Sequence, residues 1–117
     1  MRHHNKNKKF GRVTKQRKAL LRSISRSLIL HGKIKTTETK AKTLRSFVEK
    51  LISKSKTDTL ASRRIISSRL GGNSVATVKL FDTLAPKYKE RNGGYTRITK
   101  IKTRTGDAGK EVIIEFV

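Results

Sequence analysis

The side chains of this chain that could carry chemistry are overwhelmingly cationic. Its 117 residues include 30 Lys and Arg against 8 Asp and Glu, no Cys, and a formal net charge of +22. No paired carboxylates, Ser-His-Asp arrangement or phosphate-cradling glycine loop is recognisable by spacing. The histidines do not suggest metal ligands, because His3 and His4 have no acid nearby and His31 ends an expected helix, where a cation complements the dipole. We therefore expect no catalysis, no metal, no cofactor and no small-molecule substrate.

Binding to a polyanion is the chemistry that this composition favours, because a charge of this size makes a compact state repel itself. Nucleic acid is the leading partner, since lysine and arginine contacts to phosphates release counterions and give strong, salt-dependent affinity. An anionic membrane surface is the rival. However, no apolar run approaches the roughly 20 residues that span a bilayer, and no helix sets bulky aromatics opposite its cations. We expect no membrane contact and no export, and the lack of Cys fits a reducing compartment.

The first thirteen residues form a basic segment that cannot build a core. Phe10 is its one large hydrophobic anchor, and it contains no acid. We expect residues 1–13 to be an extension that is ordered by RNA phosphates rather than by packing. The RNA contacts predicted in it are Arg2, His3, His4, Lys6, Lys8, Lys9 and Arg12.

A first helix is predicted from Thr14, as its cap, to about Leu30, with Gly32 as its terminator. Its apolar face consists of Leu20, Leu21, Ile24 and Leu28. Its opposite side carries a row of cations: Lys15, Lys18, Arg22 and Arg26. Because no acid occurs before Glu38, this row is predicted to face phosphates rather than solvent alone.

A short strand at residues 33–36 leads into a second helix, which opens at Thr36 and Thr37 and runs to about Ser55. Its buried stripe is expected to be Ala41, Leu44, Val48, Leu51 and Ile52, with Phe47 at the edge. Its outer face alternates in sign through Glu38, Lys42, Arg45 and Glu49, which predicts intrahelical pairs. The start of the helix predicts a phosphate site, or simple capping, or both. Its residues are Lys33, Lys35, Thr36, Thr37 and Lys40.

The rest of the chain predicts two shorter helices and a hairpin. Asp58 or Thr57 caps a third helix to about Leu70, and Asn73 or Ser74 starts a fourth that Pro86 limits. The inward residues predicted on these helices are Ala61, Ile65, Ile66, Val78, Phe81, Leu84 and Ala85. Residues 95–104 and 111–117 form two strands joined by the loop 105–109, with a bulge in the first strand. The exposed cations of that strand divide between RNA and the acids Glu111 and Glu115; they are Lys100, Lys102 and Arg104.

Together these elements predict one α+β domain at residues 14–117, in the order α-β-α-α-α-β-β with a small mixed sheet, preceded by the basic extension 1–13. Aromatic residues are few, which argues against a platform that stacks single-stranded bases. The expected binding mode is recognition of folded, largely helical RNA by shape and backbone contacts.

Three stretches in register resemble the family of bacterial large-subunit ribosomal protein seventeen: the start MRH, IKTTETKAKTLRSFVEKLI at residues 34–52, and NGGYTRITK at residues 92–100. The resemblance implies a structural, non-catalytic protein of the cytoplasmic ribosome. It implies binding to large-subunit rRNA near the exit of the peptide tunnel, beside ribosomal protein thirty-two. The residues that match the family motifs, and that the resemblance implies as RNA contacts, are Arg2, His3, Thr36, Thr37, Lys40, Lys42, Tyr95, Thr96 and Arg97.

A nucleoid-type architectural DNA-binding protein is the alternative. Such a protein usually carries an apolar wedge on a β-arm or a clear dimer surface. The loop at residues 106–109 has neither Pro nor a large apolar tip, which counts against this alternative.

Overall fold

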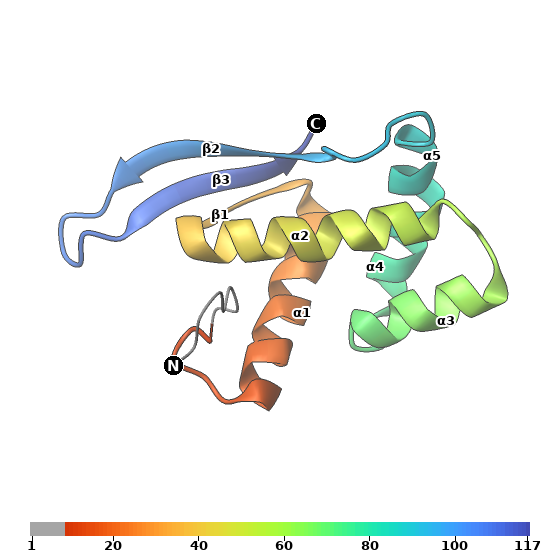
Figure 1. Cartoon of the computed structure of the whole chain (residues 1–117), viewed down its shortest axis with the longest axis horizontal. Coiled ribbons are helices and arrows are strands. Elements are labelled where there is room, and N and C mark those ends of the chain that lie inside the picture. Colours follow the sequence, from red (N-terminus) through yellow and green to blue (C-terminus); the bar gives the residue numbers. More distant parts are fainter. Residues whose placement is uncertain (1–8) are drawn as a thin grey trace, which may run out of the picture.

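The computed structural model describes residues 9–117 and arranges them in the predicted order (Figure 1). The elements are α1 (Thr14–His31), β1 (Lys33–Thr37), α2 (Glu38–Ser55), α3 (Leu60–Arg69), α4 (Ser74–Lys79), a π-helical turn (Leu80–Leu84), α5 (Ala85–Lys87), β2 (Thr96–Thr103) and β3 (Lys110–Phe116). The α+β class is therefore confirmed. In the described part of the chain, no helix is long and apolar enough to cross a membrane.

The three strands form one antiparallel sheet in the order β1-β3-β2. The expectation of a mixed sheet is wrong, because β3 lies between β1 and β2 and runs opposite to both. The predicted bulge is confirmed: the β2–β3 register shifts between Lys100 and Lys102. Ile101 is the extra residue, and its exposed side chain accounts for the poor alternation of apolar residues in this strand.

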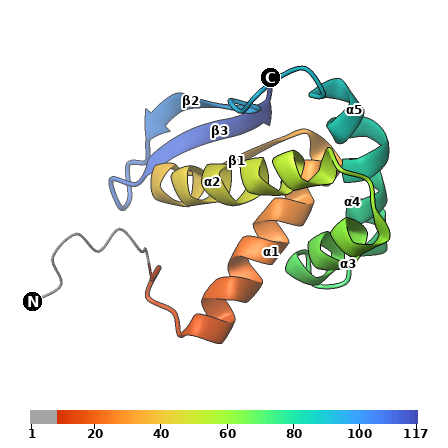
Figure 2. The ribbon, with the colours of Figure 1, turned by 45° about the vertical axis from the view of Figure 1, so that its right-hand side comes forward.

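Helix α2 lies at the centre of the fold. The sheet lies over one side of it, α1 crosses another, and α3 to α5 gather at its C-terminal end (Figures 1 and 2). Its predicted stripe is confirmed, since Ala41, Leu44, Val48, Leu51 and Ile52 are all fully buried. Burying each large aliphatic side chain contributes about 1.5–3 kcal/mol. This stripe packs in one core with residues from the other layers: Leu28, Ile29, Ile66, Leu70, Leu80, Val112 and Ile114.

The helix ends agree in part with the sequence prediction. Gly32 adopts a left-handed conformation and donates its N–H to the carbonyl of Leu28 at 2.8 Å, so it ends α1 as expected. Asn73, one of the two predicted starts, caps α4 by accepting the N–H of Ala76 at 2.9 Å, and Ser74 is the first helical residue. Thr14, however, is the first helical residue rather than the cap, and Val13 precedes it without a side-chain bond.

The cap of α3 is neither Thr57 nor Asp58. Thr59 fills that place, since its hydroxyl accepts the N–H of Ser62 at 3.1 Å. Asp58 instead accepts two hydrogen bonds from Arg63, at 2.6 and 3.0 Å. The chain thus enters the helix one residue later than Asp58 would place it.

The buried faces of α3 and α4 also differ from the prediction. Ser62 and Ile66 face the core, whereas Ala61 is exposed and Ile65 is 40% exposed. Val78 is 48% exposed, and its inward assignment is wrong because Ala76, Thr77 and Leu80 occupy that face. Phe81, Leu84 and Ala85 are buried as predicted. The helical segment that begins at Ser74 ends at Lys87, one residue beyond Pro86, close to the limit that was predicted.

Candidate nucleic-acid interface

The fold divides the cations into those that acids neutralise and those that no acid reaches. All acidic residues lie at or after Glu38, and two of them, Glu111 and Glu115, lie on β3. Lys35 pairs with Glu111 at 3.4 Å and Arg97 with Glu115 at 2.8 Å. Within residues 9–117, by contrast, the cations of α1 form no ion pair with any acid. The cations of α1 are therefore not compensated by acids, and neither are others elsewhere in the described residues, such as Lys50, Lys54 and Lys102.

The predicted cationic row on α1 splits into two halves. Lys15 and Lys18 are exposed. Arg22 and Arg26 are half-buried beside the turn after α3, and the Arg26 guanidinium donates to the carbonyl of Leu70 at 3.2 Å. A Cβ on Gly71 would lie only 3.1 Å from that guanidinium, which shows how closely Arg26 covers the turn. Arg26 therefore helps to hold α3 against α1, and the freely accessible cations are Lys15 and Lys18.

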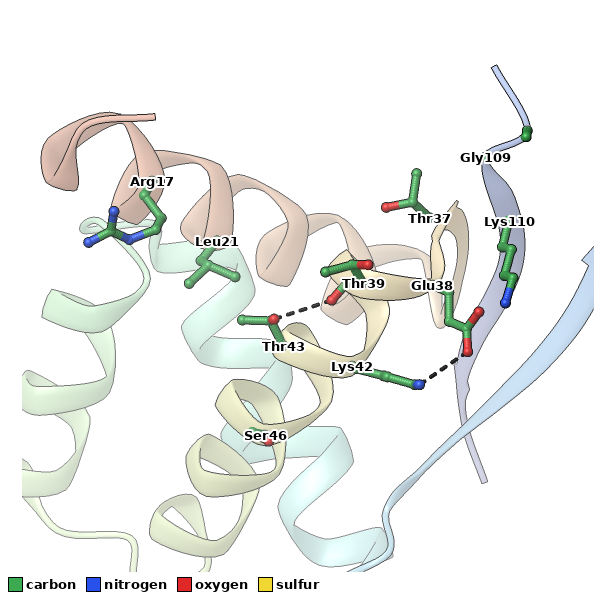
Figure 3. A pocket seen from close by; sticks show the side chains of 11 residues that line it. Arg17, Leu21, Thr37, Glu38, Thr39, Lys42, Thr43, Ser46, Gly109 and Lys110 are labelled. Carbon is green, nitrogen blue, oxygen red and sulfur yellow. Dashed lines mark hydrogen bonds and ion pairs between the residues drawn. The ribbon is translucent and has the colours of Figure 1, made fainter. Parts of the chain in front are cut away.

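A groove of about 1200 Å³ opens where α1, the start of α2 and the β2–β3 loop meet (Figure 3). We call it the α2 N-terminal groove. It is lined by Arg17 and Leu21 of α1, Thr37, Glu38, Thr39, Lys42, Thr43 and Ser46 at or on α2, and Ala108, Gly109 and Lys110. Cations and hydroxyl groups from three separate elements thus share one concave surface, a combination that suits phosphate and ribose oxygens.

The first turn of α2 borders this groove. Thr37 is its cap residue, but its side chain makes no capping hydrogen bond, so the first backbone N–H groups have no side-chain acceptor. Such N–H groups carry partial positive charge. The carboxylate of Glu38 lies at the same end and pairs with Lys42 at 3.1 Å and, more distantly, with Lys100 at 3.9 Å. The hydrogen bond from Lys42 lowers the pKa of Glu38, and the charges of Lys42, Lys100 and Lys110 lower it further, against a smaller opposing effect of burial.

Of the residues predicted for the phosphate site at this helix start, Thr37 lines the groove, and so does the motif residue Lys42. Thr36 and Lys40 are half-buried outside it, Lys33 is exposed on β1, and Lys35 is already paired with Glu111. Sequence reasoning missed Arg17, Thr39, Thr43, Ser46 and Lys110. Arg17 precedes Leu21 by four residues, so its position on the apolar side of the first helix was the available signal.

The Gly-Gly-Tyr-Thr-Arg motif has a structural role. Tyr95 is 1% exposed, its ring centroid lies 5.2 Å from that of Tyr88, and its hydroxyl is 3.2 Å from Ser53 Oγ. Burial raises the pKa of Tyr95, but Lys56 and Ser53 lower it by more. The Thr96 hydroxyl donates to Glu49 at 3.0 Å. Both residues were predicted as RNA contacts; in the fold their side chains are buried and fasten β2 to α2.

The remaining predicted contacts lie on the hairpin and in the extension. Arg97 pairs with Glu115, and Arg104 pairs with Asp107 at 2.8 Å and approaches Glu111 at 3.9 Å, so part of the hairpin charge is neutralised as expected. Lys102 is exposed. Lys9 and Arg12 are exposed too, whereas five predicted contacts lie outside the described residues: Arg2, His3, His4, Lys6 and Lys8.

Among residues 9–117, no three His, Asp or Glu side chains gather as metal ligands would.

The described residues thus form an α+β domain with a hydroxyl-lined, cationic groove beside a helix whose cations pair with no acid. Comparison with known proteins gives the family. The model of the family "Ribosomal protein L17" matches residues 20–117. The large ribosomal subunit protein bL17 of Sulfurihydrogenibium sp. (strain YO3AOP1) is 52% identical over all of this chain and 97% of its own length. The bL17 proteins of Persephonella marina and Nautilia profundicola are 53% and 50% identical, again over the whole chain, and over 95% and 98% of their own lengths. The chain belongs to the ribosomal protein L17 family, as the resemblance of its motifs predicted.

Proposed function

We propose that this chain is a structural component of the large ribosomal subunit in the cytoplasm, and that it binds large-subunit rRNA. The observation that carries the proposal is the α2 N-terminal groove, where Arg17, Lys42 and Lys110 meet a row of threonine and serine hydroxyls. Family membership and the names of the similar proteins support the ribosomal role.

The groove and the exposed part of α1 form one interface in this proposal. Lysine and arginine side chains neutralise phosphates, while the hydroxyls of Thr39, Thr43 and Ser46 bond to phosphate or ribose oxygens. Contacts of this kind read the shape of an RNA helix and its 2′-hydroxyls rather than its base sequence. The burial of Phe81, Tyr88 and Tyr95 supports the same mode, because these rings are not free to stack on bases.

The basic extension, residues 1–13, belongs to the same interface, and residues 14–117 form the domain that carries it. Rows of cations without acids need phosphates as counter-charges. Two finer points rest on the resemblance of the motifs: a position near the exit of the peptide tunnel, and contact with ribosomal protein thirty-two.

Binding to two nucleic acids tests the proposal. The full chain is titrated onto in vitro transcribed large-subunit rRNA and onto duplex DNA of equal nucleotide concentration, each at several KCl concentrations. We expect tighter binding to rRNA at every salt concentration, because ribose hydroxyls add contacts that DNA lacks. Equal or tighter binding to DNA overturns the proposal in favour of an architectural DNA-binding protein.

A further inference from the structure

A second groove, of about 620 Å³, lies on the outer side of α2 beside the turn that leads into β2. We call it the Gly93 groove. It is lined from α2 by Ser46, Glu49, Lys50, Ser53 and Lys54, and from the turn before β2 by Gly93 and Tyr95. This surface was not predicted from the sequence, because intrahelical pairing was expected along the outer face of the helix.

The acid of this groove is already occupied. The Glu49 carboxylate accepts hydrogen bonds from the Thr96 N–H at 3.4 Å and the Thr96 hydroxyl at 3.0 Å. It does not form the expected pair with Arg45. Among the residues that the structure describes, Lys50 and Lys54 have no ion-pair partner. Their charges therefore remain available to a ligand that binds in the groove.

The two grooves adjoin on α2, since Ser46 lines both of them. At about 1.5 Å per residue along a helix, Lys50 lies roughly 12 Å beyond Lys42, and Lys54 about 6 Å farther. A duplex strand advances about 3.4 Å per nucleotide, so roughly five nucleotides would cover the row. The spacing suits one continuous backbone that follows α2 from its N-terminus towards Gly93.

The far end of the groove is open to such a backbone. Gly93 has φ +105°, and a Cβ at this position would meet no protein atom within 4 Å. Among the lining residues Tyr95 alone has a large apolar side chain, and it is only 1% exposed, so the groove lacks the deep apolar pocket that centres a protein–protein contact. Its charge and hydroxyl groups favour a sugar–phosphate chain instead.

We propose that the Gly93 groove is a second RNA-binding surface, which binds the sugar–phosphate backbone of rRNA that continues from the α2 N-terminal groove. This inference rests on the proposed function. Lys50 and Lys54 bind phosphates, and Ser46 and Ser53 bond to phosphate or ribose oxygens.

The test compares the full chain with the double variant Lys50→Gln/Lys54→Gln. The matched control is Arg64→Gln/Arg69→Gln, which removes two exposed charges from α3 and none from either groove. Glutamine keeps helix propensity close to that of Lys and Arg, and circular dichroism checks that each variant is folded. The measurement is the affinity for in vitro transcribed large-subunit rRNA as a function of KCl concentration.

We expect Lys50→Gln/Lys54→Gln to flatten the log–log salt dependence by about 1.4–1.8, for two phosphate contacts at roughly 0.7–0.9 each, and the control to change it little. If the parent chain binds rRNA and both variants give its slope, the Gly93 groove does not bind RNA, and the proposed function stands. A variant that keeps the parent slope but is lost from salt-washed ribosomal subunits overturns the inference in favour of a protein neighbour. Failure of the parent chain to prefer rRNA counts against the proposed function itself.

Discussion

The guanidinium of Arg26 donates a hydrogen bond to the backbone carbonyl of Leu70, 3.2 Å away, and so joins the middle of α1 to the end of α3. A side chain from a cationic row thereby satisfies a carbonyl that has no partner within its own helix. At one end of the row, Arg26 stabilises the fold. At the other end, Lys15 and Lys18 are exposed and are accessible to a ligand.

The first prediction separates these two roles. Arg26→Gln should lower the free energy of unfolding by about 1 kcal/mol, the usual net value of one hydrogen bond, whereas Lys18→Gln should leave it within about 0.5 kcal/mol. Lys18→Gln should instead weaken rRNA binding and flatten its salt dependence by roughly 0.7–0.9. Urea denaturation and salt titrations of both variants provide the measurements. Equal destabilisation by the two substitutions would contradict the division of the row.

The second prediction concerns Tyr95. Tyr95→Phe removes the hydroxyl that lies 3.2 Å from Ser53 Oγ and should cost about 0.5–1.5 kcal/mol of stability. Tyr95 is only 1% exposed and its hydroxyl is held by Ser53, so affinity for rRNA at a temperature where the variant is folded should not change. Denaturant midpoints and binding curves decide the matter. Weaker rRNA binding at unchanged stability would return Tyr95 to the RNA interface.

The third prediction is a pH dependence. Hydrogen bonds from Lys42 and Arg63 hold the pKa values of Glu38 and Asp58 below their ordinary values of 4.5 and 3.8. The unfolded chain therefore binds protons more readily than the folded one, and the stabilisation present above about pH 5 is lost as the pH falls through 4 and below. Thermal unfolding between pH 6 and pH 3 should show this loss, and Glu38→Gln should make it smaller. An unchanged pH profile in Glu38→Gln would show that the Glu38–Lys42 pair does not contribute.

The fourth prediction concerns the extension. Removing residues 1–13 should leave the helix content of the remaining 14–117 domain nearly unchanged, because the described core lies beyond this segment. Five lysines and arginines are lost with it, so the slope of the rRNA salt titration should fall by roughly 3.5–4.5. Circular dichroism and the titration are run on both chains. Parallel log–log lines would mean that the extension does not lie on phosphates.

Local pattern was enough to predict the elements and the α2 stripe, since Ala41, Leu44 and Val48 recur with the period of a helix and face one core. The bulge at Ile101 also followed from a break in strand alternation. Which face of α3 is buried was not predictable in this way. Ala61 is more apolar than Ser62, and Ile65 is as apolar as Ile66, but entry through the Thr59 cap turns Ser62 and Ile66 inward.

The candidate interface was only half visible in the sequence, because a groove is a property of distant segments brought together. Arg17 and Lys110 are far apart in the chain and line the same surface only after the β2–β3 hairpin folds over the start of α2. Pairing is equally non-local: Glu49 was expected to neutralise Arg45 within one helix but bonds to Thr96 of β2 instead. Charge counts along the chain therefore predicted a polyanion partner, while the accessible cations could be identified only in the fold.

The most direct test of the ribosomal role is sedimentation of the cell extract from which the chain comes, through a sucrose gradient at moderate salt, with immunological detection of the chain in each fraction. The proposed function predicts that the chain sediments with the large subunit and with intact ribosomes, and that it leaves the subunit peak only at high salt, as phosphate contacts weaken. Absence of the chain from the large-subunit peak at moderate salt, or its presence with chromosomal DNA instead, would contradict the account.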